Sequence, residues 1–200
     1  MSLLFQEEKI GNITLKNRIV MPPMCMYKSD DSGELKAFHK THYLARAVGG
    51  VGLIIVEATA VEPKGRISDA DLGLWEDSQI IQHKELNEDI HFFGAKTAIQ
   101  IAHAGRKSTV KDTTPIAPSV IAFSNEEPFK IPISASLEDI KNIKELFVKT
   151  AIRAKSANYD AIELHAAHGY LLCEFLSPLS NTREDIYGGS LENRCRLVLE

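Results

Sequence analysis

Residues 51–60, VGLIIVEATA, indicate the fold class because they form a nearly unbroken apolar run. Such a run is typical of a strand covered on both faces, as in a parallel sheet. The chain continues with a predicted helix over residues 79–95 and a second apolar strand over residues 97–103, TAIQIAH. Parallel strands need a crossover between them, so this pattern predicts a strand–helix–strand unit.

The alternation of strand and helix also occurs upstream of residue 51. Residues 17–24, NRIVMPPM, predict a strand that ends at two prolines, which cannot donate ladder hydrogen bonds. Residues 39–48 predict a helix that stops at a glycine pair. Before them, Gly11 and Asn12 lie between two β-like stretches, which predicts a hairpin placed to close the bottom of a barrel.

Downstream, Ser136 and Asp139 open a helix whose apolar residues recur every three or four positions. Residues 160–166, DAIELHA, predict a fourth strand, and a fourth helix begins at Ser190. The segment 108–134 contains four prolines and no periodic pattern. A loop of that length in a compact domain is usually a lid or a binding loop.

Four alternations of strand and helix predict an α/β fold with a parallel sheet, either an open doubly wound sheet or a (β/α)8 barrel. No GxGxxG or GxxxxGK[ST] follows any strand, so the usual phosphate-binding turns of open sheets are missing from the sequence. Each strand instead ends in polar or reactive residues, which a barrel gathers on one face. This favours the (β/α)8 TIM barrel. These residues are Cys25, Glu57, Thr59, Gln100, His103, His165 and His168.

Composition excludes several classes of protein. The 200 residues are 44% hydrophobic and 25% charged, as in globular domains, and this length predicts one domain. A net charge of −4 gives no basic face for nucleic acid. No apolar run approaches the roughly 20 residues of a membrane helix. The first residues turn acidic too early for a signal peptide, and three widely spaced cysteines indicate a cytoplasmic protein.

The stretch HAAHGY, residues 165–170, carries the most specific chemistry. His165 and His168 at a strand end can aim two N–H donors at one carbonyl or nitro oxygen and stabilise negative charge there. Tyr170 can supply a proton. Two other interpretations stay open at this point: structural histidines, and metal ligands, although no HExxH or CxxC is present.

Two further strand residues point to a planar cofactor or to ordinary packing. Cys25 follows two prolines between Met24 and Met26, which suits either contact with a soft aromatic group or a small buried side chain. Gln100 lies inside an apolar strand, where an unpartnered amide costs about 1–3 kcal/mol. Its partner is either another side chain or the amide-like edge of a heterocycle.

Five motifs in order resemble the Old Yellow Enzyme family of flavoproteins, and within it the YqjM-like branch of bacterial ene-reductases. The motifs are NRIVMPPMCMY, GLIIVEATAVEPKGRI, QIAHAGRK, HAAHGYLLCEFLSPLSN and DIYGGSLENR, and the likeness runs from Leu4 to the last residue. The resemblance implies an FMN-bound TIM barrel that takes hydride from NADPH or NADH. It also implies reduction of the C=C bond of α,β-unsaturated carbonyl or nitro compounds, and a homo-oligomeric assembly.

The resemblance also assigns roles by matching motif positions. One group of residues is assigned to contact the cofactor. Within it, Cys25 tunes the redox potential of the flavin and Gln100 hydrogen-bonds its pyrimidine edge. The substrate oxygen is bound by His165 and His168, Tyr170 is the proton donor, and Tyr27 helps to seat the substrate. No metal is implied. The cofactor contacts are Pro22, Pro23, Met24, Cys25, Ala58 and Gln100.

Family members continue past residue 200 through four more βα units, which carry an arginine near the flavin and the phosphate-binding loops. Residues 1–200 are therefore expected to form the N-terminal half of a single FMN-binding barrel domain, with the hairpin and about the first four βα units. If the polypeptide ends at Glu200, we expect no stable FMN and no turnover. The alternatives are a metal-dependent TIM-barrel hydrolase using His103, His165 and His168, and a non-catalytic half-barrel.

Overall fold

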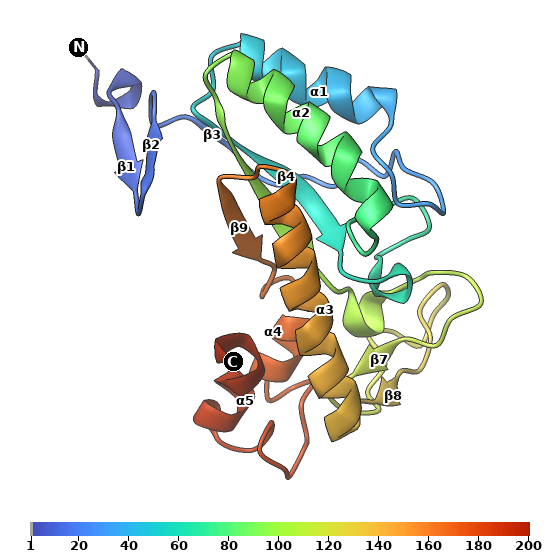
Figure 1. Cartoon of the computed structure of the whole chain (residues 1–200). Helices are drawn as coiled ribbons and strands as arrows, with labels where there is room; N and C mark the ends of the chain where they lie inside the picture. The colour runs from blue at the N-terminus through green and yellow to red at the C-terminus, as the bar shows by residue number, and fades with distance from the viewer. Residues whose placement is uncertain (1) are drawn as a thin grey trace.

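A computed structural model of the protein describes residues 2–200 and has a parallel sheet at its centre. The strands run in the order β3, β4, β6, β9, each connected to the next through a helix, and all pair in parallel (Figure 1). The four strands are β3 (Val20–Met21), β4 (Leu53–Ala60), β6 (Lys96–Ala102) and β9 (Ala161–Leu164), and the connecting helices are α1 (Ala37–Val48), α2 (Ile80–Phe92) and α3 (Leu137–Ser156). The predicted βα alternation is confirmed.

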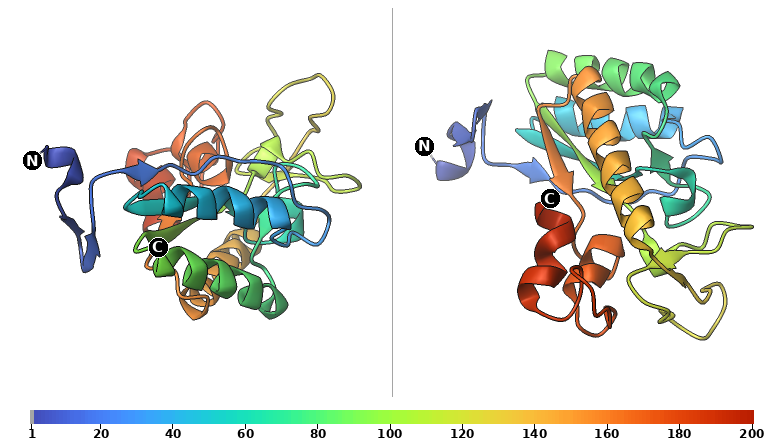
Figure 2. Two further views of the ribbon diagram at one scale, coloured as in Figure 1. Left: turned by 90° about the horizontal axis from the view of Figure 1, so that it is seen from above. Right: turned by 60° about the horizontal axis from the view of Figure 1, so that its bottom comes forward.

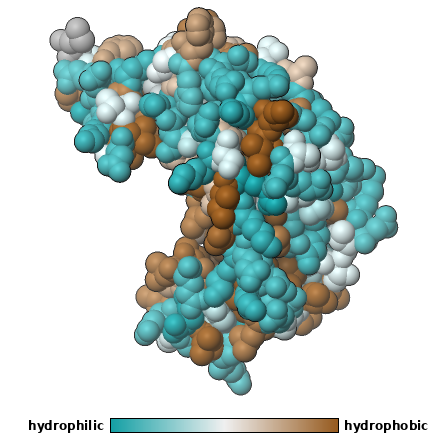
Figure 3. Space-filling view, viewed as in Figure 1, coloured by the Kyte–Doolittle hydropathy of each residue, from teal (hydrophilic) through white to brown (hydrophobic). Residues whose placement is uncertain are grey.

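The two faces of the sheet differ in what covers them. Ile54 of β4 and Ile99 of β6 face the helices and join Tyr43, Leu86 and others in the main apolar core. The alternate residues form a second cluster on the inner face of the sheet, which includes Leu53 and Ala98. The helices curve around one side of the sheet (Figure 2). The molecule is hollowed between the hairpin and the C-terminal helices, as expected for an arc of a barrel (Figure 3).

The first strand is shorter than predicted. Only Val20 and Met21 pair with β4, at Leu53 and Ile54, instead of the whole stretch 17–24. Pro22 and Pro23 lack N–H groups and leave the ladder, so the chain runs on in an extended conformation without regular pairing. The residues after Met21 are therefore free to line the end of the sheet.

The N-terminal hairpin is confirmed. Strands β1 (Glu8–Ile10) and β2 (Ile13–Leu15) pair antiparallel around a turn in which Gly11 has a φ of +57°. Leu15 is buried against Leu53 and Ala98 at the start of β4 and β6. The hairpin thus contacts the N-terminal ends of the strands, as predicted, while its tip projects away (Figure 1).

Several short elements surround the C-terminal ends of the strands. The predicted lid segment holds the parallel pair β7 and β8, and β5 pairs with the end of β4. None of the helices in residues 2–200 is long and apolar enough to cross a bilayer. The short elements are η1 (Leu3–Phe5), η2 (Pro63–Gly65), β5 (Leu72–Gly73), η3 (Asp77–Gln79), η4 (Gly105–Lys107), β7 (Ile116–Ala117), β8 (Ile133–Ser134), α4 (Leu171–Leu176) and α5 (Leu191–Leu199).

Helix α3 begins at the predicted capping box. The Ser136 hydroxyl accepts from the N–H of Asp139 at 3.1 Å, and the Asp139 carboxylate accepts from the N–H of Ser136 at 2.9 Å. Ser136→Ala should lower the free energy of unfolding by about 1 kcal/mol, because it removes one of these two reciprocal bonds. Urea denaturation measures the change. Ser156→Ala, at the exposed end of the same helix, is the control and should change stability less.

Candidate active site

A cavity of about 520 Å³ lies at the C-terminal ends of β6 and β9, bounded by the segment that follows β3. Eight of the residues predicted from the sequence line it, although they come from three separate parts of the chain. Glu163, Leu164, Ala166 and Ala167 complete the lining. The eight are Pro22, Pro23, Met24, Cys25, Gln100, His165, His168 and Tyr170.

A bulge in β4 corrects one expectation. The β4–β6 register shifts between Val56 and Thr59, and the side chain of Glu57 points toward α1, where it is 1% exposed. Glu57 and Thr59 therefore do not line the cavity, contrary to the prediction from their place at a strand end. The bulge leaves the buried Ala58 next to Cys25, whose thiol faces the backbone N–H of Ala58.

The turn after β9 brings three ring side chains together. The His165 ring lies 5.1 Å from that of His168 and 4.9 Å from that of Tyr170, edge to face in both cases. This packing requires a sharp turn, in which His168 and Gly169 have φ values of +57° and +70°. A positive φ in a non-glycine residue is a strained conformation that occurs often at functional sites.

The protonation of these rings suits hydrogen-bond donation. Burial, and then the neighbouring His168, lower the pKa of His165, so its imidazole is neutral at pH 7 and carries one N–H. Burial raises the pKa of Tyr170, which keeps its phenol protonated. Both groups can therefore donate to an oxygen that gains negative charge.

Cys25 lines the cavity, and Tyr27 lies beside it without being part of the lining. Burial, followed by the charges of Asp71 and Glu57, raises the pKa of the Cys25 thiol to about 11, so it is protonated at neutral pH. Tyr27 is hydrogen-bonded to Cys25, and burial raises its pKa to about 12. Tyr27 has a φ of +52°, which turns its side chain back beside the thiol.

Gln100 has a side-chain partner across the sheet. Its Nε2 donates to Oε1 of Glu163 at 2.5 Å, between register partners on β6 and β9. An amide has a second N–H and an oxygen, so this contact leaves further hydrogen-bonding capacity at the cavity floor. Sequence reasoning missed Glu163. Its alternation with Ala161 and His165 in DAIELHA was the available signal, since these residues share one face of the strand.

Comparison with known proteins identifies the family. The family model for the NADH:flavin oxidoreductase / NADH oxidase family matches residues 3–200, which is nearly the whole chain. The chain belongs to this family. The resemblance to Old Yellow Enzymes seen in the sequence motifs is thereby confirmed.

Curated relatives of this flavin oxidoreductase family are similar over the full chain. An NADPH dehydrogenase of Bacillus licheniformis is 56% identical over 198 residues, which cover 98% of this chain and 58% of that protein. An NADPH dehydrogenase of Clostridium acetobutylicum is 50% identical over 197 residues, with the same coverage. The chain therefore spans somewhat more than half the length of these relatives.

Solved structures of family members share the fold. Morphinone reductase superimposes with a TM-score of 0.92 at 33% identity, covering 98% of this chain and 56% of that one. Old Yellow Enzyme from Pichia sp. AKU4542 gives a TM-score of 0.92 at 32% identity, covering 98% and 54%. The strands and helices described above are accordingly part of a TIM barrel, as predicted.

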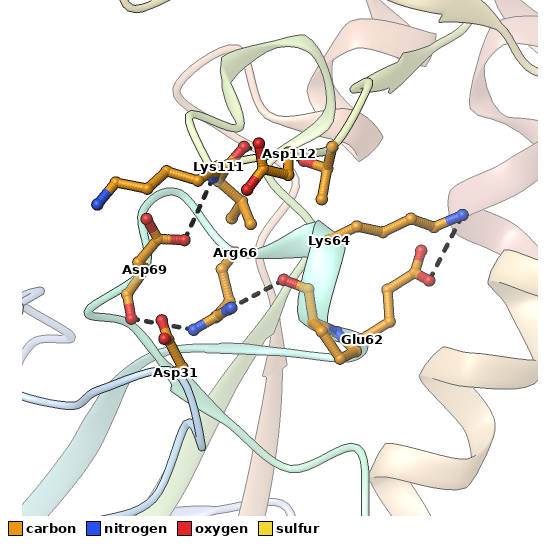
Figure 4. Close-up of a pocket in the computed structure, with 10 residues that line it drawn as sticks. Asp31, Glu62, Lys64, Arg66, Asp69, Lys111 and Asp112 are labelled. Carbon is orange, nitrogen blue, oxygen red and sulfur yellow. Dashed lines mark hydrogen bonds and ion pairs between the residues drawn. The ribbon is translucent and has the colours of Figure 1, made fainter.

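His103 is separate from the histidine pair. Its Nε2 lies 2.9 Å from Oε1 of Glu62. Glu62 in turn lies beside a second cavity of about 580 Å³, between the η2 loop and the segment after η4 (Figure 4). Within residues 2–200, no three His, Cys, Asp or Glu side chains are grouped to hold a metal ion. Within that part of the chain, His103 is therefore not grouped with His165 and His168 as the metal-ligand alternative requires.

Lys107 and Glu174 connect the η4 turn to its surroundings. The sequence suggested that the cations Arg106 and Lys107 suit either an anionic cofactor or a solvated rim, and it gave Glu174 no role. The Lys107 ammonium donates to the carbonyl of His168 at 2.8 Å and lies 4.2 Å from the ring centre of Phe123 in the predicted lid. Glu174, fully buried, accepts from the N–H of Arg106 at 2.9 Å. The η4 turn is thus bonded to Glu174 through the N–H of Arg106, and to the turn after β9 through Lys107.

Glu174 should make stability depend on pH. Burial raises its pKa to about 8 from an ordinary value of 4.5, so between these values the folded state binds more protons than the unfolded state. The free energy of unfolding should therefore fall as pH rises from about 5 to about 8. Glu174→Gln should flatten this dependence in urea denaturation. Glu145→Gln, an exposed change on α3, should leave the slope as it is; an unchanged slope in Glu174→Gln contradicts the assignment.

Proposed function

We propose that the protein is an FMN-dependent oxidoreductase that uses NADPH or NADH to reduce the C=C bond of activated alkenes. The observation that carries the proposal is the cavity itself. Its lining brings together His165, His168 and Tyr170 with Cys25 and the Pro22–Met24 segment. Family membership and the relatives named NADPH dehydrogenase support it. A structural neighbour at TM-score 0.92, morphinone reductase, is solved in complex with tetrahydroNAD, which supports a nicotinamide donor.

The residues present fit a flavin. Pro22, Pro23 and Met24 provide an apolar wall for a planar ring, and the amide of Gln100 lies at the floor with hydrogen-bonding capacity left after its contact with Glu163. Ala58 is small and buried, and its N–H faces the thiol of Cys25. When FMN is bound, the chemistry available at the site is hydride transfer, first from NAD(P)H and then to the β-carbon of the alkene.

The histidines polarise the substrate. An activated alkene places its carbonyl or nitro oxygen against His165 and His168, whose N–H groups donate to it. As hydride reaches the β-carbon, negative charge moves onto that oxygen and both hydrogen bonds strengthen, which lowers the barrier. Tyr170, protonated at neutral pH, supplies the proton that completes the saturated product. Tyr27, hydrogen-bonded to Cys25, helps to seat the substrate.

We further propose that residues 1–200 are the N-terminal half of a single FMN-binding barrel domain, and that the whole protein acts as a homo-oligomer on small molecules without nucleic acid. Within the described residues 2–200, the outer edges of β3 and β9 pair with no further strand, which supports the first point because a closed barrel pairs every strand. The length of the relatives supports it as well.

The proposal is tested with the purified protein at its full natural length. We expect a stoichiometric flavin spectrum, loss of the oxidised flavin absorbance on adding NADPH without oxygen, and its recovery on adding an enone. The metal-hydrolase alternative predicts bound metal and no flavin, so metal analysis of the same sample distinguishes the two. Reduction of the flavin without recovery by any enone, nitroalkene or maleimide contradicts ene-reduction while retaining a flavin oxidoreductase.

A further inference from the structure

The buried carboxylate of Glu57 lies directly behind the segment that carries Cys25 and Tyr27. Its Oε2 accepts from the backbone N–H of Met26 at 2.8 Å, and the N–H of Tyr27 also faces the carboxylate. On the N-terminal side the segment is held by β3, which ends at Met21. On the C-terminal side the N–H of Ser29 donates to the carbonyl of Ala70 at 3.0 Å. Glu57 therefore holds the middle of an otherwise extended stretch.

Helix α1 fixes the carboxylate from the other side. The Tyr43 hydroxyl donates to Oε1 of Glu57 at 3.1 Å and accepts from the backbone N–H of Glu57 at 3.0 Å. Tyr43 is fully buried, so its position is set by the core. This reciprocal pair allows little freedom to the Glu57 side chain.

His39 of α1 also faces the carboxylate, without a hydrogen bond to it. Its Nδ1 accepts from the N–H of Lys36 at 3.0 Å, so in the neutral ring the proton is on Nε2. Nε2 lies 3.6 Å from Oε1 of Glu57 and has no closer hydrogen-bond partner in the described part of the chain. Burial lowers the pKa of His39 to about 4, which keeps the ring neutral. The groups around Glu57 therefore present N–H or O–H groups to it. Burial raises the pKa of Glu57 to about 7, so above that pH they face a carboxylate that acts as an acceptor.

The held turn is strained. Tyr27 has a φ of +52°, an unfavourable conformation for a bulky residue that persists only where its surroundings impose it. The same conformation places the Tyr27 side chain beside the thiol of Cys25. Releasing Met26 and Tyr27 from the carboxylate removes the contact that opposes relaxation of this turn.

We infer that Glu57 is a positioning residue. Because it is bonded both to Tyr43 of α1 and to the backbone of Met26, it fixes the turn that presents Cys25 and Tyr27 relative to α1. The effect of Glu57 on the reaction rests on the proposed flavin function, whereas its hydrogen bonds to the turn do not depend on that function. Glu57 touches neither the cavity nor its contents, and acts only through the Met26–Tyr27 backbone.

The experiment compares Glu57→Gln with the native protein, without added flavin, by two measurements. Hydrogen exchange at Met26 and Tyr27 should be about tenfold faster, since the charged acceptor is lost. Alkylation of Cys25, followed by mass spectrometry over pH 8 to about 11, should move to lower pH, because Glu57, with Asp71, raises the pKa of the thiol. Cys195 on α5 is the internal reference and should not change.

Two variants control for general loss of stability. Glu174→Gln removes a buried carboxylate that also accepts a backbone N–H, at Arg106, and should leave Met26, Tyr27 and Cys25 unchanged. Tyr43→Phe keeps the charge of Glu57 but removes the donor that holds it, so exchange should rise at Met26 without the same shift at Cys25. If Glu57→Gln does not fold, Tyr43→Phe still tests the inference.

The inference is overturned if exchange at Met26 and Tyr27 and the Cys25 profile in Glu57→Gln match those of the native protein. It is also overturned if Tyr43→Phe leaves exchange at Met26 unchanged. Failure of the proposed function has a different signature, namely the absence of a reducible flavin with the exchange result intact. The two proposals can therefore fail separately.

Discussion

His165→Ala should reduce the rate of enone reduction by about 10²- to 10³-fold, as expected when one donor to a developing oxyanion is removed. The substitution takes away one of two N–H groups that converge on the cavity, and leaves His168 to stabilise the charge alone. Because these bonds strengthen in the transition state, the loss should fall mainly on kcat. Stopped-flow measurement of flavin reoxidation by the enone, in the FMN-loaded protein at its full natural length, isolates this step.

The same variant should bind phenolic ligands more weakly, because we expect a phenolate oxygen to accept hydrogen bonds from the same two histidines. Reduction of the flavin by NADPH is measured as an internal check that the cofactor remains bound. His42→Ala, which removes a partly exposed histidine of α1 stacked on Phe38, is the matched control and should turn over normally. Unchanged enone turnover in His165→Ala would refute its role in substrate polarisation.

Ile99→Ala should lower the free energy of unfolding by about 2–5 kcal/mol, the range for truncating a buried isoleucine. Ile99 is fully buried on β6 and belongs to the core between the sheet and the helices. The substitution removes apolar contacts and leaves a cavity that close-packed neighbours cannot fill. Urea denaturation of the 200-residue chain measures the change.

Ile162→Ala is the control for this prediction, because Ile162 is the register partner of Ile99 on β9 and points to the same side of the sheet. It is 39% exposed, so we expect it to cost clearly less than Ile99→Ala. Equal costs for the two substitutions contradict the claim that helix packing covers β6 more completely than β9.

Local patterns in the sequence predicted much of the fold. The capping box at Ser136, the hairpin turn at Gly11 and the apolar run of β4 each rest on contacts within a few residues, so they can be read without a tertiary structure. The histidine pair was found for the same reason, since both members belong to one turn. The motif order then identified the family, which the family model confirms.

Other features could not be predicted from the sequence, because the residues that contact each other are distant in the chain. Glu57 was expected at the barrel mouth, and a bulge turned it toward Tyr43 of α1. The sequence indicated that the Gln100 amide needs a hydrogen-bond partner. That this partner is Glu163, 63 residues away, depends on the register between β6 and β9. The role of Lys107 depends on a contact with the His168 carbonyl that only the turn after β9 creates.

The sequence by itself determined the class of this protein, its family and the residue types available for chemistry, because periodicity, turn residues and motifs are local properties. Length alone suggested one domain, whereas the motif order predicted the N-terminal half of a barrel domain. In residues 2–200, four parallel barrel strands are paired and their outer edges have no strand partner. Only the tertiary structure decided which side chains meet. Strand register, the β4 bulge and the strained turns at Tyr27 and His168 set the direction of each side chain, and these depend on packing between segments far apart in the chain.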